Sequence, residues 1–288
     1  MQKQPLFHKP ISELIRQRHS CRTFAVGGIE AEMRREIRDF FPLLPPPFAG
    51  HVRLDILDKE KIKAENFFTS GTYGMIKGAR YFMAGIIPKS EERGWENFGF
   101  VMEAAVLKAA DLGLETCWIG GVFDRKRFGR ELGIGDNELL PAVVAVGHAA
   151  GGRTFRDRFV RWSAHGDRRK PFAELFFGQT AAQPVHIVQN VRFGAILENV
   201  RLAPSASNKQ PWRVFLEENR FHFYLARDRA YARLMPGVDL QRIDMGIAMC
   251  HFELSCLDAG IAGNWADLRP EISGLPESYE YIVSFRTG

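Results

Sequence analysis

A pentapeptide near the start of the chain carries the residue types that grip a phosphate. In Arg18-His-Ser-Cys-Arg22 two arginines flank a hydroxyl side chain. Guanidinium groups donate charge-assisted, often bidentate hydrogen bonds to phosphate oxygens, so this spacing is suited to a phosphate-bearing ligand. The same residues are also typical of a helix C-terminus, where cations interact favourably with the helix dipole. The pentapeptide alone leaves both interpretations open.

A second polar stretch, Arg201-Leu-Ala-Pro-Ser-Ala-Ser-Asn-Lys-Gln-Pro-Trp-Arg213, lies between a predicted helix and a predicted strand. Its prolines, serines and asparagine are residues whose side chains shape turns and bond to backbone groups. A loop held between two rigid elements presents small polar groups to a ligand. Taken alone, the stretch is equally typical of an ordinary turn.

Common catalytic and metal-binding signatures are absent from the sequence. There is no Walker loop, no G-x-S-x-G, no H-E-x-x-H, and no G-x-G-x-x-G between a strand and a helix. We expect the isolated histidines to be structural, namely His148, His222 and His251. The four cysteines are far apart or lie in apolar helices, which predicts reduced thiols in a cytoplasmic protein and no metal site.

Length and composition predict an ordinary soluble protein. The 288 residues are 45% hydrophobic and 25% charged, enough for one or two domains with a sizeable core. No apolar run approaches the roughly 20 residues of a membrane span, and the N-terminus lacks the apolar core of a signal peptide. We therefore expect no membrane partner.

The net charge of +5 is concentrated in one segment. Residues 153–170 hold seven basic and two acidic residues. Such a run is typical of a solvated linker. It is also compatible with binding nucleic acid or a membrane surface, or with one arginine facing a small phosphate. A nucleic-acid site normally adds interleaved aromatic residues, and here only Phe155 and Trp162 are present.

Hydrophobic periodicity predicts mixed helices and strands around these stretches. In the first half we expect a helix opened by Pro10 and Ser12, then helix 29–41, strands 52–57 and 81–87, helix 97–112, strand 116–119, a helix from Asp124 to 132, and strand 142–146. Strand 52–57 alternates apolar and polar residues, which predicts one buried face. Helix 97–112 is apolar nearly all round, so it should lie in the middle of its half.

The second half repeats this order. A second apolar helix, 244–258, matches helix 97–112 at a shift of 147 residues, so that Gly113 meets Gly260 and Trp118 meets Trp265. The earlier elements match at a shift of about 160 residues, as expected for an internal repeat. Further β-prone segments surround Tyr224 and Tyr281. The predicted fold class is α+β, in two repeated halves, each with a mainly antiparallel sheet packed on helices around a central buried helix.

Together, the two polar stretches resemble motifs of the nitroreductase family of flavoproteins. The family pattern is Arg-x-Ser-x-Arg/Lys after the first helix, Pro-Ser-x-x-Asn-x-Gln-Pro-Trp before a strand, and a long buried helix ending in a glycine turn and a short strand with glycines. Here these are Arg18–Arg22, Pro204–Trp212, and Asp111-Leu-Gly-Leu-Glu-Thr-Cys-Trp-Ile-Gly-Gly121.

The order of the motifs departs from the family. Family members are homodimers in which the arginine motif of one subunit and the loop of its mate hold FMN. Here the arginine motif lies in the first half and the loop in the second, while the reciprocal positions, 45–50 and 176–182, have lost the pattern. The resemblance therefore implies a fused pseudo-dimer with one FMN site, with halves at 1–170 and 171–288. Such a chain is expected to be a monomer or a weak homo-oligomer.

The resemblance also implies the site residues. Arg18, Ser20 and Arg22 would hold the phosphate and ribityl chain, and His19 would lie beside them through its backbone. Backbone N–H groups of Gly120 and Gly121 would face flavin N5. The other expected cofactor-binding residues are Tyr73, Arg168, Arg169, Pro204, Ser205, Ser207 and Asn208.

The implied function is an FMN-dependent oxidoreductase. Hydride would pass from NAD(P)H through N5 to a small organic acceptor, such as a nitroaromatic, a quinone or an enone, with no catalytic side chain required. The alternative is a non-catalytic FMN-binding or sensing protein. A third interpretation is a nucleic-acid-binding protein built on residues 153–170. It lacks the aromatic platform or helix motif that such binding uses, so we expect no nucleic-acid partner.

Overall fold

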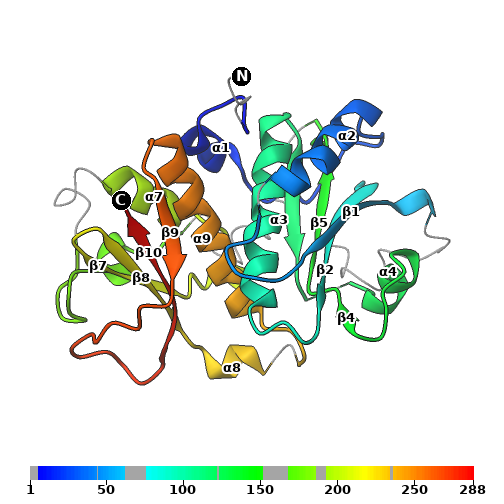
Figure 1. Ribbon diagram of the computed structural model, residues 1–288. Helices are drawn as coiled ribbons and strands as arrows, with labels where there is room; N and C mark the ends of the chain where they lie inside the picture. Colours follow the sequence, from blue (N-terminus) through cyan, green and yellow to red (C-terminus); the bar gives the residue numbers. More distant parts are fainter. Residues whose placement is uncertain are drawn as a thin grey trace. The chain divides into compact units, whose positions relative to one another are not determined.

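The computed structural model describes residues 6–43, 45–61, 76–121, 123–151, 168–185, 193–233 and 236–288 (Figure 1). The chain forms two compact units, Met1–His165 and Gly166–Gly288. The boundary at 170/171 expected from the sequence stays a prediction. Each unit is described by itself.

Unit 1 contains an antiparallel sheet with the strand order β1-β2-β5-β3. Its strands are β1 (Arg53–Asp58), β2 (Tyr81–Pro88), β3 (Glu115–Ile119) and β5 (Val143–Gly147), and a short β4 (Glu138–Leu139) also pairs with β2. The strands β2 and β5 are buried throughout nearly their whole length, because both faces of the sheet are covered. One face packs on helix α3, and the other contributes Phe82, Val143 and Ala145 to an apolar cluster.

The central helix of unit 1 is α3 (Gly94–Asp111), and almost every residue in it is buried. It lies so close to β2 that a Cβ atom built on Gly85 would stand 2.7 Å from the ring of Phe98. The helix ends at Gly113, whose φ of +77° is the left-handed conformation that glycine adopts readily. The sequence predicted apolar residues around nearly the whole of this helix, and the helix is indeed buried on all sides.

Shorter helices complete unit 1. They are α1 (Ile11–Gln17), α2 (Ala31–Phe40), α4 (Arg125–Glu131) and the 3-10 turns η1 (Phe41–Leu43) and η2 (Lys59–Lys61). Asp124 caps α4, accepting a hydrogen bond from the N–H of Arg127 at 3.1 Å, as the sequence predicted.

Unit 2 contains the sheet β6-β7-β8-β10-β9, antiparallel except for the parallel pair β6 and β7. Its strands are β6 (Phe176–Phe177), β7 (Trp212–Glu217), β8 (Arg220–Ala226), β9 (Gly263–Ala266) and β10 (Tyr279–Thr287). Its helical segments are α6 (Phe172–Leu175), α7 (Gly194–Arg201), η4 (Ala206–Asn208), α8 (Arg229–Ala232) and the long α9 (Leu240–Asp258). Phe223, Phe252, Trp265 and Phe285 pack edge-on or tilted against one another between α9 and the sheet.

The two units repeat one order of elements (Figure 1). The order β1-β2-β5-β3 in unit 1 corresponds to β7-β8-β10-β9 in unit 2, and the long helix follows the second strand of each set along the chain. In both units a tryptophan of the strand after that helix donates its indole N–H to a carboxyl on the helix: Trp118 to Glu103, and Trp265 to Glu253. The α+β class with mainly antiparallel sheets is confirmed.

Two details of the sequence interpretation are wrong. The strand predicted at 52–57 does not alternate in burial, because Ile56 and Leu57 are both buried. Leu57 faces the apolar cluster, while α2 packs against the strand, so both faces are covered at this end. The helix predicted at 244–258 begins at Leu240, because Asp239 caps it by accepting a hydrogen bond from the N–H of Arg242 at 3.1 Å.

Candidate functional site

The Arg18–Arg22 segment runs along the outer edge of β3. Ser20 forms a parallel bridge with Thr116, and the N–H of Cys21 donates to the carbonyl of Thr116 at 2.9 Å. The side chain of Cys21 is buried in the apolar cluster of unit 1. Because side chains alternate along an extended segment, we expect Ser20 on the face opposite Cys21, with Arg18 and Arg22 two residues to either side of it. Helix α1 ends at Gln17 with Arg18 as its C-cap residue. Arg22 lies beyond the helix end, so it is not a cation of the helix terminus.

Arg18 is held by the central helix. Its Nε lies 3.9 Å from a carboxylate oxygen of Glu103, whose other oxygen accepts the indole N–H of Trp118 at 2.8 Å. The Arg18 side chain is 7% exposed and Glu103 is fully buried. At 3.9 Å the pair is an ion pair but not a hydrogen bond, and Nε of Arg18 has no hydrogen-bond partner. The guanidinium is therefore positioned with donor capacity unused.

The neighbouring residues are held mainly through their backbone. His19 lies 3.4 Å from the carboxylate of Glu115, and its ring also contacts the carbonyl of Gln17. The carbonyl of Arg22 accepts from the N–H of Lys77 at 2.8 Å. Among the described residues no ion pair or hydrogen bond engages the guanidinium of Arg22, which is half-buried. Within the described part of the chain the charge of Arg22 is therefore not paired.

Gly120 and Gly121 follow β3 directly, at the end away from Ser20. The carbonyl of Gly120 accepts a hydrogen bond from Arg125. Gly121 is exposed. The edge of β3 therefore carries the arginine segment at its start and the glycine pair at its end.

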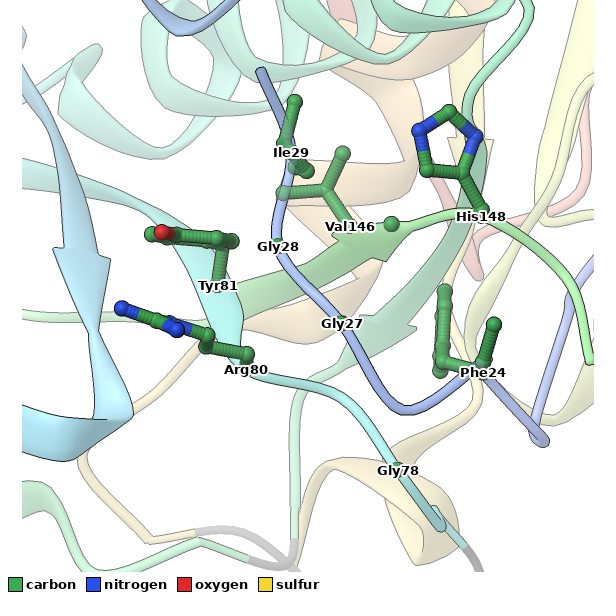
Figure 2. Close-up of a pocket in the computed structure, with 11 residues that line it drawn as sticks. Phe24, Gly27, Gly28, Ile29, Gly78, Arg80, Tyr81, Val146 and His148 are labelled. Atoms are coloured by element: carbon green, nitrogen blue, oxygen red, sulfur yellow. The ribbon is translucent and has the colours of Figure 1, made fainter. Parts of the chain in front are cut away.

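A small pocket lies where β2 begins and β5 ends (Figure 2). The backbone of Gly27 and Gly28 crosses it, and Tyr81, His148 and Arg80 contribute side chains. The guanidinium of Arg80 donates to Asp58 at 2.8 Å and pairs with Glu60 at the same distance, so its charge is already balanced. The pocket is small, and we assign it no ligand.

In unit 2 the Pro204–Trp212 loop adopts an unusual backbone conformation. Ser207, Asn208 and Gln210 have φ values of +50°, +54° and +48°, the left-handed region that non-glycine residues rarely adopt. Such conformations persist only where surrounding contacts impose them. The side chain of Gln210, which is 2% exposed, supplies several: it accepts from the N–H of Lys170 at 2.8 Å and donates to the carbonyl of Asn208 at 3.1 Å.

Asp244 of α9 also holds the Pro204–Trp212 loop in place. Its Oδ1 accepts a hydrogen bond from the N–H of Ala206 at 2.9 Å, while its Oδ2 has no hydrogen-bond partner. Burial raises the pKa of Asp244 well above its usual value, although the hydrogen bond from Ala206 acts in the opposite direction.

The matching position in unit 1 is Asn97, at the same shift of 147 residues that aligns Gly113 with Gly260. Its Oδ1 accepts from the N–H of Phe48 at 3.1 Å, and its Nδ2 donates to the carbonyl of Phe48 at 3.2 Å. One helix position therefore secures the equivalent loop in each unit, with an amide in one and a carboxyl in the other.

The other expected ligand residues of unit 2 bind the loop. Arg169 donates to Oδ1 of Asn208 at 2.8 Å and to the carbonyl of Leu202, while Nδ2 of Asn208 donates to the carbonyl of Arg168. Ser205 accepts from the N–H of Gln210, and the hydroxyl of Ser207 lies 3.1 Å from that of Tyr231. These side chains shape the loop, which leaves its backbone and exposed face for a ligand.

The segment after the first helix differs between the units. After α1 it joins the β3 edge of the sheet, whereas after α6 it pairs as β6 with β7, the strand that corresponds to β1. The second copy therefore lacks both the arginines and the position on the sheet that the first copy has.

A family model described as "Putative TM nitroreductase" matches residues 10–256. The chain belongs to this nitroreductase family. No curated protein matches the sequence.

One solved structure shows that the chain shares the fold of a nitroreductase-family protein. A crystal structure described as a putative nitroreductase from Thermotoga maritima matches with a TM-score of 0.61 and 16% identity, covering 99% of this chain and 96% of that chain. An FMN-dependent nitroreductase from Clostridium difficile matches at a TM-score of 0.42 and 21% identity, over 49% of this chain and 88% of that one. A nitroreductase with bound FMN from Desulfitobacterium hafniense matches with a TM-score of 0.42 and 16% identity, covering 50% of this chain and 92% of that chain.

Tyr73 lies outside the described residues, as does most of the basic segment 153–170. The four cysteines are free thiols and buried. The described residues form no cluster of metal-ligating side chains, and none of their helices is long and apolar enough to cross a membrane.

The isolated histidines each have a partner within the fold. The ring of His222 lies 2.6 Å from the hydroxyl of Ser284, and that of His251 lies 2.8 Å from the carbonyl of Asn199. His148 lies 3.2 Å from Glu30.

Sequence reasoning missed three residues that contact the predicted motifs within their own unit: Glu103 and Arg125 in unit 1 and Asp244 in unit 2. The contacts that these residues make join positions 85, 5 and 38 residues apart, respectively, and no sequence pattern marks any of them. The one available signal was the alignment of the two halves, which places Asp244 opposite Asn97 in otherwise apolar helices.

Proposed function

We propose that this chain is an FMN-dependent oxidoreductase that takes hydride from NAD(P)H and delivers it to a small organic acceptor. The observation that carries the proposal is the arginine segment anchored along β3, in a chain of the nitroreductase family. FMN, when bound, accepts hydride at N5 and passes it on to a nitroaromatic, quinone or enone acceptor.

The residues present fit a flavin phosphate. Arg18 is nearly buried, and its Nε has no hydrogen-bond partner. A buried cation with unused donors is costly unless a ligand completes its hydrogen bonds. Arg22, in the same segment, adds a second charge, and Ser20 between them supplies a hydroxyl. This donor set suits a phosphate oxygen cluster.

The remaining ligands stay as the sequence predicted them. We assign the ribityl chain and ring to the backbone of His19, to Gly120 and Gly121, and to Pro204, Ser205, Ser207 and Asn208. Arg168 or Arg169 would add a phosphate contact, and Tyr73 would flank the ring. The bonds of Arg169 to Asn208 and Leu202 favour an indirect role, in which its guanidinium stabilises the loop.

We further propose one FMN per chain. The second copy of the arginine segment is replaced by Phe176-Phe-Gly-Gln-Thr-Ala-Ala182, and this stretch begins on the other edge of its sheet. Without guanidinium groups a phosphate has no charged donors there. The proposal includes a cytoplasmic monomer or weak homo-oligomer, arisen by internal duplication, with no nucleic-acid or membrane partner.

Anaerobic titration with NADH and NADPH tests the function. The expected result is loss of the oxidised flavin absorbance of the loaded protein with at least one donor, and its return when a quinone or nitroaromatic compound is added. Flavin that binds but stays oxidised with both donors would contradict the oxidoreductase and favour the alternative, a non-catalytic FMN-binding or sensing protein.

A further inference from the structure

Arg125 is the first residue of α4, and its guanidinium packs on the first of three aromatic rings that contact one another in turn. The centre of its guanidinium lies 4.5 Å from the ring centroid of Phe123. Phe123 packs edge-on against Phe128 at 5.4 Å, and Phe128 packs against Phe82 of β2 at 5.5 Å. A guanidinium on an aromatic face is attracted by the ring electrons. The cation is therefore fixed on side chains that reach into the core of unit 1.

The charge of Arg125 has no acidic counterpart among the described residues. Burial alone lowers its pKa, and no neighbouring carboxylate opposes the shift. Its Nε is buried and has no hydrogen-bond partner. An arginine stays protonated in proteins, and a half-buried charge without a carboxylate partner costs free energy. This cost indicates a role that the fold alone does not explain.

The hydrogen bonds of Arg125 fix one peptide group. Its Nη2 donates to the carbonyl of Gly120 and, at 3.0 Å, to the carbonyl of Pro141. The carbonyl of Gly120 and the N–H of Gly121 belong to the same peptide, and in a trans peptide these two groups point in opposite directions. The N–H of Gly121 therefore points away from Arg125, and no described residue accepts a hydrogen bond from it.

The hydrogen bond from Arg125 to the Gly120 carbonyl also strengthens the Gly121 N–H as a donor. A hydrogen bond to a carbonyl oxygen polarises its peptide group, so the N–H at the other end becomes a better donor. The fixed positive charge nearby favours an acceptor that gains electron density. Gly121 is exposed and carries no side chain, so a planar ring can approach its backbone closely.

We propose that Arg125 is a positioning residue that aims and strengthens the Gly121 N–H as a hydrogen-bond donor to the N5 edge of the flavin. The proposal rests on the FMN-dependent function proposed above. Arg125 does not touch the cofactor in this account. It acts through the Gly120–Gly121 peptide, and its charge favours the reduced cofactor, which is the more electron-rich form.

A purely structural role for Arg125 predicts something different. Joining Gly120 to Pro141 secures the turn between β3 and α4, and losing that link would lower the stability of the protein. Under a purely structural role, losing this link would leave the electronic state of a bound flavin unchanged. The two roles therefore separate in properties measured on the flavin itself.

The test uses the full chain loaded with FMN labelled with ¹⁵N at N5. Arg125→Gln removes the charge, Arg125→Lys keeps it, and Lys126→Gln removes an exposed charge from the neighbouring position of α4. We would measure the N5 resonance, the two-electron midpoint potential and the FMN dissociation constant. Arg125→Gln is expected to shift the N5 resonance and to lower the reduction equilibrium constant about tenfold, equivalent to about 30 mV for two electrons.

Arg125→Lys should recover part of both changes, and Lys126→Gln should cause neither. An N5 resonance and potential that stay unchanged in folded, FMN-loaded Arg125→Gln and Arg125→Lys overturn the positioning role alone. Failure of the unmodified protein to bind FMN overturns the proposed function, and the positioning role with it.

Discussion

At the scale of single residues, the long helix of each unit uses a buried carboxyl to hold one of the two polar motifs. Asp244 holds the Pro204–Trp212 loop through the N–H of Ala206, and Glu103 orients Arg18. These groups are buried within apolar helices, where an unsatisfied polar atom is costly. The free-energy cost of burying these carboxyls is offset because they hold polar segments that form little regular structure of their own.

Replacing Asp244 with Asn should remove a pH dependence of stability. Burial raises the pKa of Asp244 in the folded state, so the folded protein holds this proton more tightly than the unfolded chain. Its contribution is therefore complete below the unfolded-state pKa of about 3.9 and is lost as the pH rises through the folded-state pKa. Relative to the unmodified protein, Asp244→Asn should gain stability with rising pH, by at most about 1.4 kcal/mol per pH unit.

Urea unfolding of the protein without FMN between pH 4 and 8 measures this difference. Asp228→Asn is the matched control: the hydrogen bond from the N–H of Tyr231 lowers the pKa of Asp228, so this carboxyl is ionised in both the folded and unfolded states over most of this range, and its replacement should leave the pH dependence of stability unchanged. Parallel stability profiles for Asp244→Asn and the unmodified protein would show that Asp244 is not a buried, proton-binding group.

Replacing Arg22 with Ala should weaken FMN binding. Each charge-assisted hydrogen bond lost costs about 1.5–3 kcal/mol, or roughly tenfold to a hundredfold in the dissociation constant. Quenching of flavin fluorescence measures the affinity. Arg16→Ala, which removes an exposed arginine from the last turn of α1, should leave it unchanged. Equal affinities for both variants would argue against Arg22 as a phosphate ligand.

At the scale of elements, sequence patterns located the helices and strands but not the long-range pairing that builds the site. The apolar circumference of α3 and α9 and the glycines after them are local signals, and they predicted the two central helices. The pairing of Ser20 with Thr116 joins segments almost a hundred residues apart, and no periodicity encodes it. The left-handed residues Ser207, Asn208 and Gln210 were also hidden, because tertiary contacts impose their conformation.

Replacing Gln210 with Ala should destabilise unit 2 by about 1–3 kcal/mol, because backbone groups of the loop lose their buried partner. The loop should relax from its left-handed conformation, and FMN affinity should fall with it. Thermal unfolding and flavin titration measure the two effects. Lys209→Ala, an exposed change in the same loop, should cause only a small loss of stability. A Gln210→Ala protein of unchanged stability would contradict the role given to its amide.

At the scale of the whole molecule, each unit has the same strand order around one central helix, yet the units differ at the positions that would bind a cofactor. The arginine segment follows α1 alone, and the Pro-Ser-x-x-Asn-x-Gln-Pro-Trp loop precedes β7 alone. The sequence predicted this complementarity because both motifs are short and local. It did not predict that the two copies of the first segment join different edges of their sheets.

The stoichiometry of flavin binding tests the central claim most directly. The full chain, freed of any bound flavin, would be titrated with FMN while absorbance and protein concentration are measured independently. The account predicts saturation at one FMN per chain. Saturation at two would contradict the single site, and no binding at all would contradict the flavin-dependent function.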